Sequence, residues 1–285
     1  MKKKIRIIML ALLNLITVNS MIQKAHAQKP DTSGYAHVNG LNLYYEVYGQ
    51  GKPIVLVHGA YQTIQLCWGT MIPDLMKHRK VIAIDLQGHG RTADISRPFS
   101  YKAFASDIAA LLKHLNIDKA DIMGFSVGGT TAMELAIKHP GVVDKLIVIS
   151  APYKYSGWLP AMRNMLQALH PAFLDKTSYR AAHSGIYKDS VAFHKFTSKF
   201  IKFDEENFDL GETNIKNIKV PVLLIMGDND GIDLAHKAEM YQLCGGNVFS
   251  DLSGPRPSQL AILPNTGHMN LILQKDKVLE FVNGF

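Results

Sequence analysis

Six short apolar runs recur between residues 53 and 265, and they predict the strands of a buried sheet. The runs are PIVLVHG (53–59), KVIAIDL (80–86), DIMGF (121–125), KLIVIS (145–150), VPVLLIMGD (220–228) and QLAILPN (259–265). They are too hydrophobic for strands with one face in water, and a parallel sheet covered on both faces requires runs of this kind. We therefore expect all six strands to be buried on both sides.

Segments with helical spacing separate most of these runs. They are residues 101–115, 130–139, 233–243 and 276–285. In the first, apolar residues follow one another three or four positions apart, as on one face of a helix. Before the first run, residues 35–49 alternate around Asn39-Gly40, a pair that tolerates positive φ and so predicts a β-hairpin. The alternation of strands and helices favours an α/β protein with a mostly parallel central sheet flanked by helices.

Residues 151–217 break this alternation. They contain no strong strand run and are rich in aromatic residues and Met. We expect a helical cap insertion over one end of the sheet, within a core formed by residues 28–150 and 218–285. The alternative is a group of extra helices packed beside the sheet.

Residues 1–27 have the pattern of an export signal. A basic start (MKKKIR) precedes twelve apolar residues (7–18), and AHA (25–27) is a small-x-small cleavage pattern. Twelve residues are too few for a bilayer, which needs about 20. We expect cleavage after Ala27, Gln28 as the first residue of the mature chain, and export to the periplasm or the medium. An uncleaved anchor is the alternative, and no Cys in the segment offers a site for a lipid.

The basic charge of the chain comes mostly from this segment. The formal net charge is +7, but residues 1–27 hold five basic residues and no acidic one, so 26 basic and 24 acidic residues remain after them. A nearly neutral chain gives no argument for a nucleic-acid partner. We likewise expect no stable membrane association once the signal is removed.

Two cysteines, Cys67 and Cys244, lie 177 positions apart in predicted helical segments. An oxidising compartment permits a disulfide between them, but the spacing favours two buried, unpaired thiols. No clustered Cys and His spacing indicates a metal site, and we expect neither a metal nor a cofactor.

The sequence GFSVG (124–128) stands where the third apolar run passes into a helical pattern. A strand that ends at Phe125 and a helix that begins at Val127 leave Ser126 on a tight, strained turn. Side chains at positions 124 and 128 would crowd that turn, so glycine is needed there. The turn lifts the Ser126 hydroxyl clear of the sheet. The alternative is a glycine-rich helix start with Ser126 as its N-cap.

A serine hydroxyl needs a base within hydrogen-bond reach, and the base needs an orienting acid. His268 follows the last apolar run, and Asp228 and Asp230 follow the run before it. Both carboxylates therefore come before the histidine, each at the end of a predicted strand. Position alone leaves the choice between the two acids open, and Asp228 can instead hold its own turn.

Four ordered motifs resemble the α/β-hydrolase fold superfamily, in its serine esterase-like branch with a helical cap. They are His58-Gly59, DLQGHGRT (85–92), GFSVG (124–128) and the late acid and histidine. The resemblance implies Ser126 as nucleophile and His268 as base. It favours Asp230 as the acid, because Gly227-Asp228-Asn229-Asp230 fits a G-x-x-D loop. Some relatives carry the acid after an earlier strand, but residues 145–153 offer none.

The resemblance also assigns supporting residues. The backbone N–H groups of Ala60 and Val127 are expected to form the oxyanion hole. His58 braces its loop, Trp68 packs in the core, and Asp85 anchors the loop at 85–92. Substrate contacts are expected from four side chains, Tyr61, Phe125, Trp158 and Met269.

The sequence thus predicts a secreted serine hydrolase that cleaves carboxylic esters of small molecules through an acyl-enzyme. The same triad supports a lactonase, a perhydrolase or cofactor-free haloperoxidase, a carbon–carbon bond hydrolase, or an amidase. Residues 151–217 show no evident acidic cluster to capture a substrate amine, which disfavours an aminopeptidase. A receptor-like ligand-binding protein that retains the fold is the non-enzymatic alternative. The oligomeric state stays open.

Overall fold

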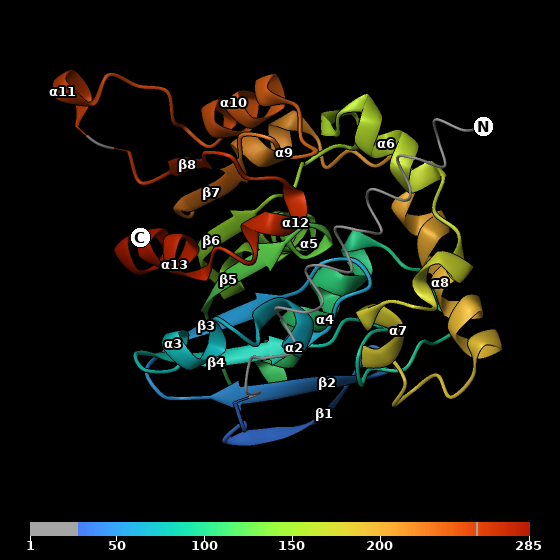
Figure 1. Cartoon of the computed structure of the whole chain (residues 1–285). Helices are drawn as coiled ribbons and strands as arrows, with labels where there is room; N and C mark the ends of the chain where they lie inside the picture. The colour runs from blue at the N-terminus through green and yellow to red at the C-terminus, as the bar shows by residue number, and fades with distance from the viewer. Residues whose placement is uncertain (1–27, 255) are drawn as a thin grey trace.

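An eight-stranded sheet organises residues 28–254 and 256–285, which the computed structural model describes (Figure 1). The spatial order is β1-β2-β4-β3-β5-β6-β7-β8. The strands are β1 (Thr32–Val38), β2 (Leu41–Tyr48), β3 (Lys52–Val57), β4 (Arg79–Ile84), β5 (Ala120–Phe125), β6 (Val143–Ile149), β7 (Val222–Gly227) and β8 (Gln259–Leu263). All six apolar runs therefore form strands. The expected export signal, residues 1–27, lies outside the described residues.

The first two strands form the predicted antiparallel hairpin. Val38 pairs with Leu41 across a two-residue turn. Asn39 and Gly40 occupy that turn with φ of 50° and 76°, as the favoured two-residue hairpin turns require. β2 also pairs antiparallel with β4, and every later pair in the sheet is parallel. The predicted mostly parallel sheet is confirmed.

Helices cover both faces of the sheet and make two hydrophobic cores. In β3, Val55 and Val57 belong to the core shared with α4 and α5, whereas Ile54 and Leu56 belong to the core shared with α2, α3 and α13. The helices of these layers are α2 (Ile64–Trp68), α3 (Ile72–Leu75), α4 (Tyr101–His114), α5 (Val127–Lys138), α9 (Glu212–Lys216), α10 (Leu234–Leu243), α12 (His268–Leu271) and α13 (Lys275–Gly284), with the 3₁₀ turn η1 (Pro140–Val142). The short helix α11 (Ser250–Ser253) lies apart from the sheet (Figure 1).

The last strand departs from the prediction of full burial. β8 pairs only with β7 and forms one edge of the sheet. Gln259 is exposed, and Ile262 keeps 41% of its surface accessible. An edge strand has a neighbour on one side only, so the helices that cover the middle of the sheet shield it less. The expectation that all six runs are buried on both faces is wrong for this one.

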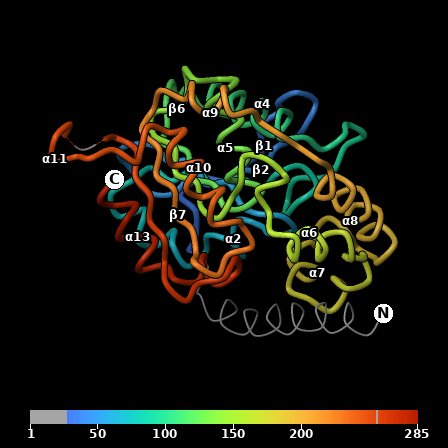
Figure 2. Tube along the Cα trace, turned by 90° about the horizontal axis from the view of Figure 1, so that it is seen from above, coloured from blue at the N-terminus to red at the C-terminus, as the bar shows by residue number. Residues whose placement is uncertain are grey.

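Helices, not strands, fill most of the chain between β6 and β7. Besides α9, they are η2 (Tyr155–Gly157), α6 (Pro160–Gln167), η3 (Pro171–Leu174), α7 (Ser178–Ala182) and α8 (Ser190–Asp204). In the view from above, α6, α7 and α8 lie together on one side (Figure 2). The Phe200 ring lies 5.1 Å from that of Tyr61, and the Phe196 ring 5.0 Å from that of His89. Tyr61 and His89 follow β3 and β4, so α8 packs on the carboxyl end of the sheet. That residues 151–217 form a separate cap domain stays a prediction.

Both cysteines are unpaired in the described part of the chain, as expected. Cys67 is buried, whereas Cys244 is only half-buried. None of the helices in residues 28–254 and 256–285 has the length and hydrophobicity to span a membrane.

Candidate active site

The turn between β5 and α5 places the candidate nucleophile. Ser126 has φ of 54° and ψ of −121°, a strained conformation for a residue with a side chain. A Cβ at Gly124 would lie 2.1 Å from the carbonyl oxygen of Gly128, and one at Gly128 would lie 2.1 Å from that of Val57. Only glycine fits at either position, which is the steric reason predicted from the sequence. The Ser126 side chain caps no N–H of α5, so the N-cap alternative does not describe it.

Three side chains from distant segments meet at this turn. His268 Nε2 lies 3.1 Å from Ser126 Oγ, and His268 Nδ1 lies 3.0 Å from Asp230 Oδ1. Asp230 follows β7, and His268 is the first residue of α12, after β8. Because parallel strands end at the same edge of the sheet, the loops after β5, β7 and β8 are neighbours. The structure thus brings together the three residues expected from the sequence, in a chain of hydrogen bonds that ends on a carboxylate.

Asp228 has a different place. Its carboxylate accepts hydrogen bonds from the N–H groups of Asn265 and Thr266, at 2.9 Å and 2.8 Å. These bonds lower the pKa of Asp228 and tie it to the loop that leads into His268. The carboxylate that reaches the imidazole is that of Asp230, so Asp228 is a brace for this loop.

Ser150 is a member of the site that the sequence analysis missed. It directly follows β6 with φ of 50°, and its hydroxyl lies 2.5 Å from Asp230 Oδ2 and 2.6 Å from His268 Nδ1. The hydroxyl can donate to the carboxylate and accept from the ring N–H at the same time. Its signal in the sequence is only a hydroxyl residue at the end of a predicted strand, which is common in any protein.

Asp230 remains an anion in this setting. It is 3% exposed, and burial alone would raise its pKa. The hydrogen bonds from His268 and Ser150 outweigh burial and hold the pKa of Asp230 below its ordinary value. An ionised carboxylate beside Nδ1 keeps the proton on that nitrogen and leaves Nε2 free to accept a proton from Ser126.

Removing the Ser150 hydroxyl should therefore weaken the orientation of His268 without removing any reacting group. We expect Ser150→Ala to lower kcat on a short p-nitrophenyl ester about tenfold, with KM unchanged, because one hydrogen bond to a charged group is lost. Steady-state kinetics and thermal unfolding measure the two effects. Ser106→Ala, which removes a hydroxyl from α4 away from the site, is the control. An unchanged kcat in Ser150→Ala would show that the hydroxyl does not position the imidazole.

Two backbone N–H groups expected to form an oxyanion hole lack protein partners. Within the described residues, neither Ala60 nor Val127 donates its N–H to another group. His58 braces the first of these loops, as expected. Its Nδ1 lies 2.8 Å from Gly59 O, and its Nε2 accepts from Leu86 N–H at 3.0 Å. Burial lowers the pKa of His58 to about 3, so the ring is neutral and makes both bonds.

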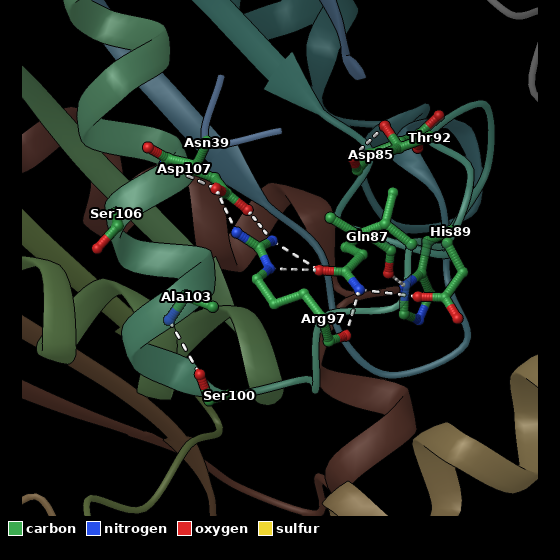
Figure 3. A network of polar contacts seen from close by, with 12 residues as sticks. Asn39, Asp85, Gln87, His89, Thr92, Arg97, Ser100, Ala103, Ser106 and Asp107 are labelled. Carbon is green, nitrogen blue, oxygen red and sulfur yellow. Dashed lines mark hydrogen bonds and ion pairs between the residues drawn. The ribbon is translucent and has the colours of Figure 1, made fainter. Parts of the chain in front are cut away.

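The loop after β4 supports the loop after β3. Tyr61 N–H donates to His89 Nε2 at 3.1 Å, and Ile64 N–H donates to Asp85 at 2.9 Å. Figure 3 shows how the loop is itself held: Arg97 binds Gln87 and the Asp107 carboxylate of α4, each at 2.6 Å. The expected anchoring role of Asp85 and the burial of Trp68 are both observed. The position of Ala60 is thus fixed by a polar network that extends to α4.

Three of the four expected substrate-contact residues lie close to the triad or its loops. The rings of Phe125 and Trp158 lie 5.1 Å and 5.4 Å from the His268 imidazole. Tyr61 is buried against Phe200 of α8. Met269, next to His268 in α12, is partly buried against the core. Contact of these four side chains with a substrate stays a prediction. No cluster of His, Cys, Asp or Glu suited to a metal ion is found among residues 28–254 and 256–285.

Comparison with known proteins agrees with this architecture. Residues 52–185 match the family model described as alpha/beta hydrolase fold. The 2-hydroxy-6-oxo-2,4-heptadienoate hydrolase of Pseudomonas putida is 27% identical over 266 residues, covering 83% of this chain and 90% of that protein. Carboxylesterase CesB of Bacillus subtilis superposes with a TM-score of 0.69 at 18% identity, over 96% of this chain and 97% of that one. The enol-lactonase of Burkholderia xenovorans LB400 gives 0.65 at 21% identity, over 87% and 99%.

The family match begins at β3 and includes the loops that carry Ala60, Asp85 and Ser126. The likeness to the two solved structures extends over most of the chain. The strand order, the turn at Ser126 and both comparisons lead to one conclusion: the chain has the α/β-hydrolase fold.

Proposed function

We propose that the protein is a serine hydrolase that cleaves carboxylic esters of small molecules through an acyl-enzyme. The observation that carries the proposal is the hydrogen-bonded series from Ser126 through His268 to Asp230, with contacts of 3.1 Å and 3.0 Å. A nucleophile, a base and an orienting acid in that order are what acyl transfer by a serine requires. The strained turn at Ser126 adds support, because it presents the hydroxyl to His268 at the carboxyl edge of the sheet.

Each group then has a defined part in the reaction. The Ser126 oxygen attacks the ester carbonyl carbon while His268 takes the hydroxyl proton. The carbonyl oxygen becomes an oxyanion and accepts hydrogen bonds from the N–H groups of Ala60 and Val127. His268 returns the proton to the leaving alcohol, and Asp230 stabilises the imidazolium in between. Water repeats the sequence on the acyl-enzyme and releases the acid.

Carbon–carbon bond hydrolysis is the second candidate, because one relative supports it. The name of the Pseudomonas putida protein describes a substrate without ester, lactone or amide bonds, so its hydrolysis breaks a carbon–carbon bond. Lactone hydrolysis has the support of one structural neighbour, and ester hydrolysis that of another. Amide cleavage and perhydrolysis use the same groups without support from these relatives. A receptor that binds without turnover gives no reason for the short contacts at His268.

A comparison of substrates tests the proposal. We expect short p-nitrophenyl esters to be hydrolysed with a larger kcat/KM than a γ-lactone or a 2-hydroxy-6-oxo-dienoate. A fluorophosphonate should label Ser126 and stop all hydrolysis, which peptide mass spectrometry and residual activity would show. A larger kcat/KM on the dienoate would reject ester hydrolysis in favour of the second candidate. Tight ligand binding without labelling or turnover would reject the enzyme altogether.

Export is part of the same proposal and depends on residues 1–27 alone. The basic start, the twelve apolar residues and the AHA sequence are its support. Cleavage after Ala27 would leave the whole of β1 to β8 and every candidate site residue in the mature chain. The proposed enzyme would then meet its substrate outside the cytoplasm.

A further inference from the structure

The apolar face of α8 includes one carboxylate, that of Asp204. Phe196, Phe200 and Asp204 follow one another at four-residue intervals, so they lie on one side of the helix. The Phe196 ring contacts His89, and the Phe200 ring contacts Tyr61. Asp204 continues this line by one turn. The last residue of α8 therefore lies on the helix face that packs on the carboxyl end of the sheet, the end at which the triad lies.

Asp204 has no cation to pair with in the described part of the chain. None of the ion pairs or side-chain hydrogen bonds there includes its carboxylate, and its place at the C-terminus of a helix is unfavourable for an anion. Burial raises the pKa of Asp204 to about 7, the nearby His268 opposes that rise, and Glu205 adds to it. Part of the residue remains accessible to solvent, so a small ligand can reach it.

A second unsatisfied polar group belongs to Tyr61, whose ring packs against Phe200 of α8. Tyr61 is 6% exposed, and its hydroxyl has no hydrogen-bond partner among the described residues. Burial raises the pKa of Tyr61 well above its ordinary value, and among the charged groups that raise it further Asp204 has the largest effect. Tyr61 directly follows Ala60 of the expected oxyanion hole. A buried hydroxyl without a partner is uncommon in proteins, and this one belongs to a residue that packs on Phe200, one helical turn before Asp204.

We propose that Asp204 and the Tyr61 hydroxyl bind a positively charged amino group of the substrate, one that lies close to the scissile carbonyl, as in an amino acid ester. This inference rests on the proposed acyl transfer at Ser126 and names its substrate class. An ammonium group supplies the missing positive charge and N–H donors, which Asp204 and the tyrosine oxygen accept. The rings of Tyr61 and Phe200 offer aromatic faces beside it. An anionic dienoate would be repelled at this point.

The proposal departs from one expectation drawn from the sequence. Residues 204–206 read Asp-Glu-Glu, but the segment 151–217 was described as lacking an acidic cluster for a substrate amine. A charge run at a helix end is usually solvated, and that expectation fits Glu206, which is exposed. Asp204 differs in its place on the helix face that carries Phe196 and Phe200. On this proposal, the expectation against amino-group substrates no longer applies.

Two esters that differ only in the charged group test the proposal. In 2-naphthyl L-alaninate an ammonium group occupies the place of one methyl group of 2-naphthyl isobutyrate. At pH 7 most of the alanine ester carries its charge. We expect the wild-type protein to prefer the alanine ester in kcat/KM. Asp204→Asn should lower kcat/KM for the alanine ester about 10- to 100-fold, the effect of losing one hydrogen bond between charged groups, and leave the isobutyrate ester within about twofold.

Two further variants control for charge and fold. Glu206→Gln removes a neighbouring exposed negative charge and should leave both esters unchanged. Asp204→Glu keeps the charge and should retain part of the preference. Equal losses on both esters in Asp204→Asn, or no preference in the wild type, would overturn the proposal while ester hydrolysis itself stands. If neither ester is hydrolysed, the proposed function fails, and calorimetry decides the amine site separately: L-alaninamide should bind the wild type and not Asp204→Asn, and absence of binding to both would reject it.

Discussion

Replacing Ser126 by alanine should abolish nearly all hydrolysis of a short p-nitrophenyl ester. We expect kcat/KM to fall on the order of 10⁴-fold or more, because the variant loses the atom that forms the acyl-enzyme. His268 and Asp230 remain in place, yet a base without its nucleophile can only assist water. The oxyanion donors Ala60 and Val127 also remain and account for the small rate that is left. Steady-state kinetics with the purified variant measures the loss.

Two further measurements distinguish loss of the nucleophile in Ser126→Ala from loss of the folded structure. Alanine at φ of 54° carries the same Cβ as serine, so the backbone strain at the turn between β5 and α5 is unchanged. Thermal unfolding of Ser126→Ala should therefore match the wild type, and labelling by a fluorophosphonate should disappear. Ser106→Ala removes a hydroxyl from the surface of α4 and should retain both labelling and turnover. Near-normal hydrolysis by folded Ser126→Ala would reject the serine mechanism.

The strands of the central sheet could be predicted because each is marked by its own apolar run. Buried parallel strands need continuous apolar residues, and each run reports this without reference to its neighbours. The hairpin was equally local, since Asn39 and Gly40 tolerate the φ values that the turn requires. Burial of β8 was misjudged because the same apolar run serves a central or an edge strand. Whether Ile262 is covered depends on the strand order, which no single segment contains.

The candidate site likewise contains residues that the sequence predicts and residues that only the fold reveals. Ser126 was predictable because its tight turn requires glycine at the positions two before and two after it. His268 was predictable because it closely follows the last apolar run. Ser150 and Asp204 carry no such local mark. A serine after a strand and an acid at a helix end are common in any protein. What makes them part of the site is the neighbour that folding supplies, His268 in one case and Tyr61 in the other.

Replacing Asp230 by asparagine should have the second-largest effect. We expect kcat to fall by roughly 10⁴-fold, the cost of the same change in a serine protease triad. The Asp230 carboxylate accepts the Nδ1 proton of His268 and so leaves Nε2 able to take the proton of Ser126. An asparagine amide can turn its NH₂ group toward Nδ1. That reverses the tautomer, places a proton on Nε2, and leaves the serine without a base.

Asp228→Asn is the matched control, since it makes the same change two positions away. Its side-chain oxygen can still accept the N–H of Thr266 or Asn265, and neither bond includes the imidazole. We expect kcat to change less than tenfold. Kinetics of both variants, with thermal unfolding to confirm that each is folded, makes the comparison. A larger loss in Asp228→Asn than in Asp230→Asn would reverse the two roles and make the loop brace, not the buried carboxylate, the group on which the base depends.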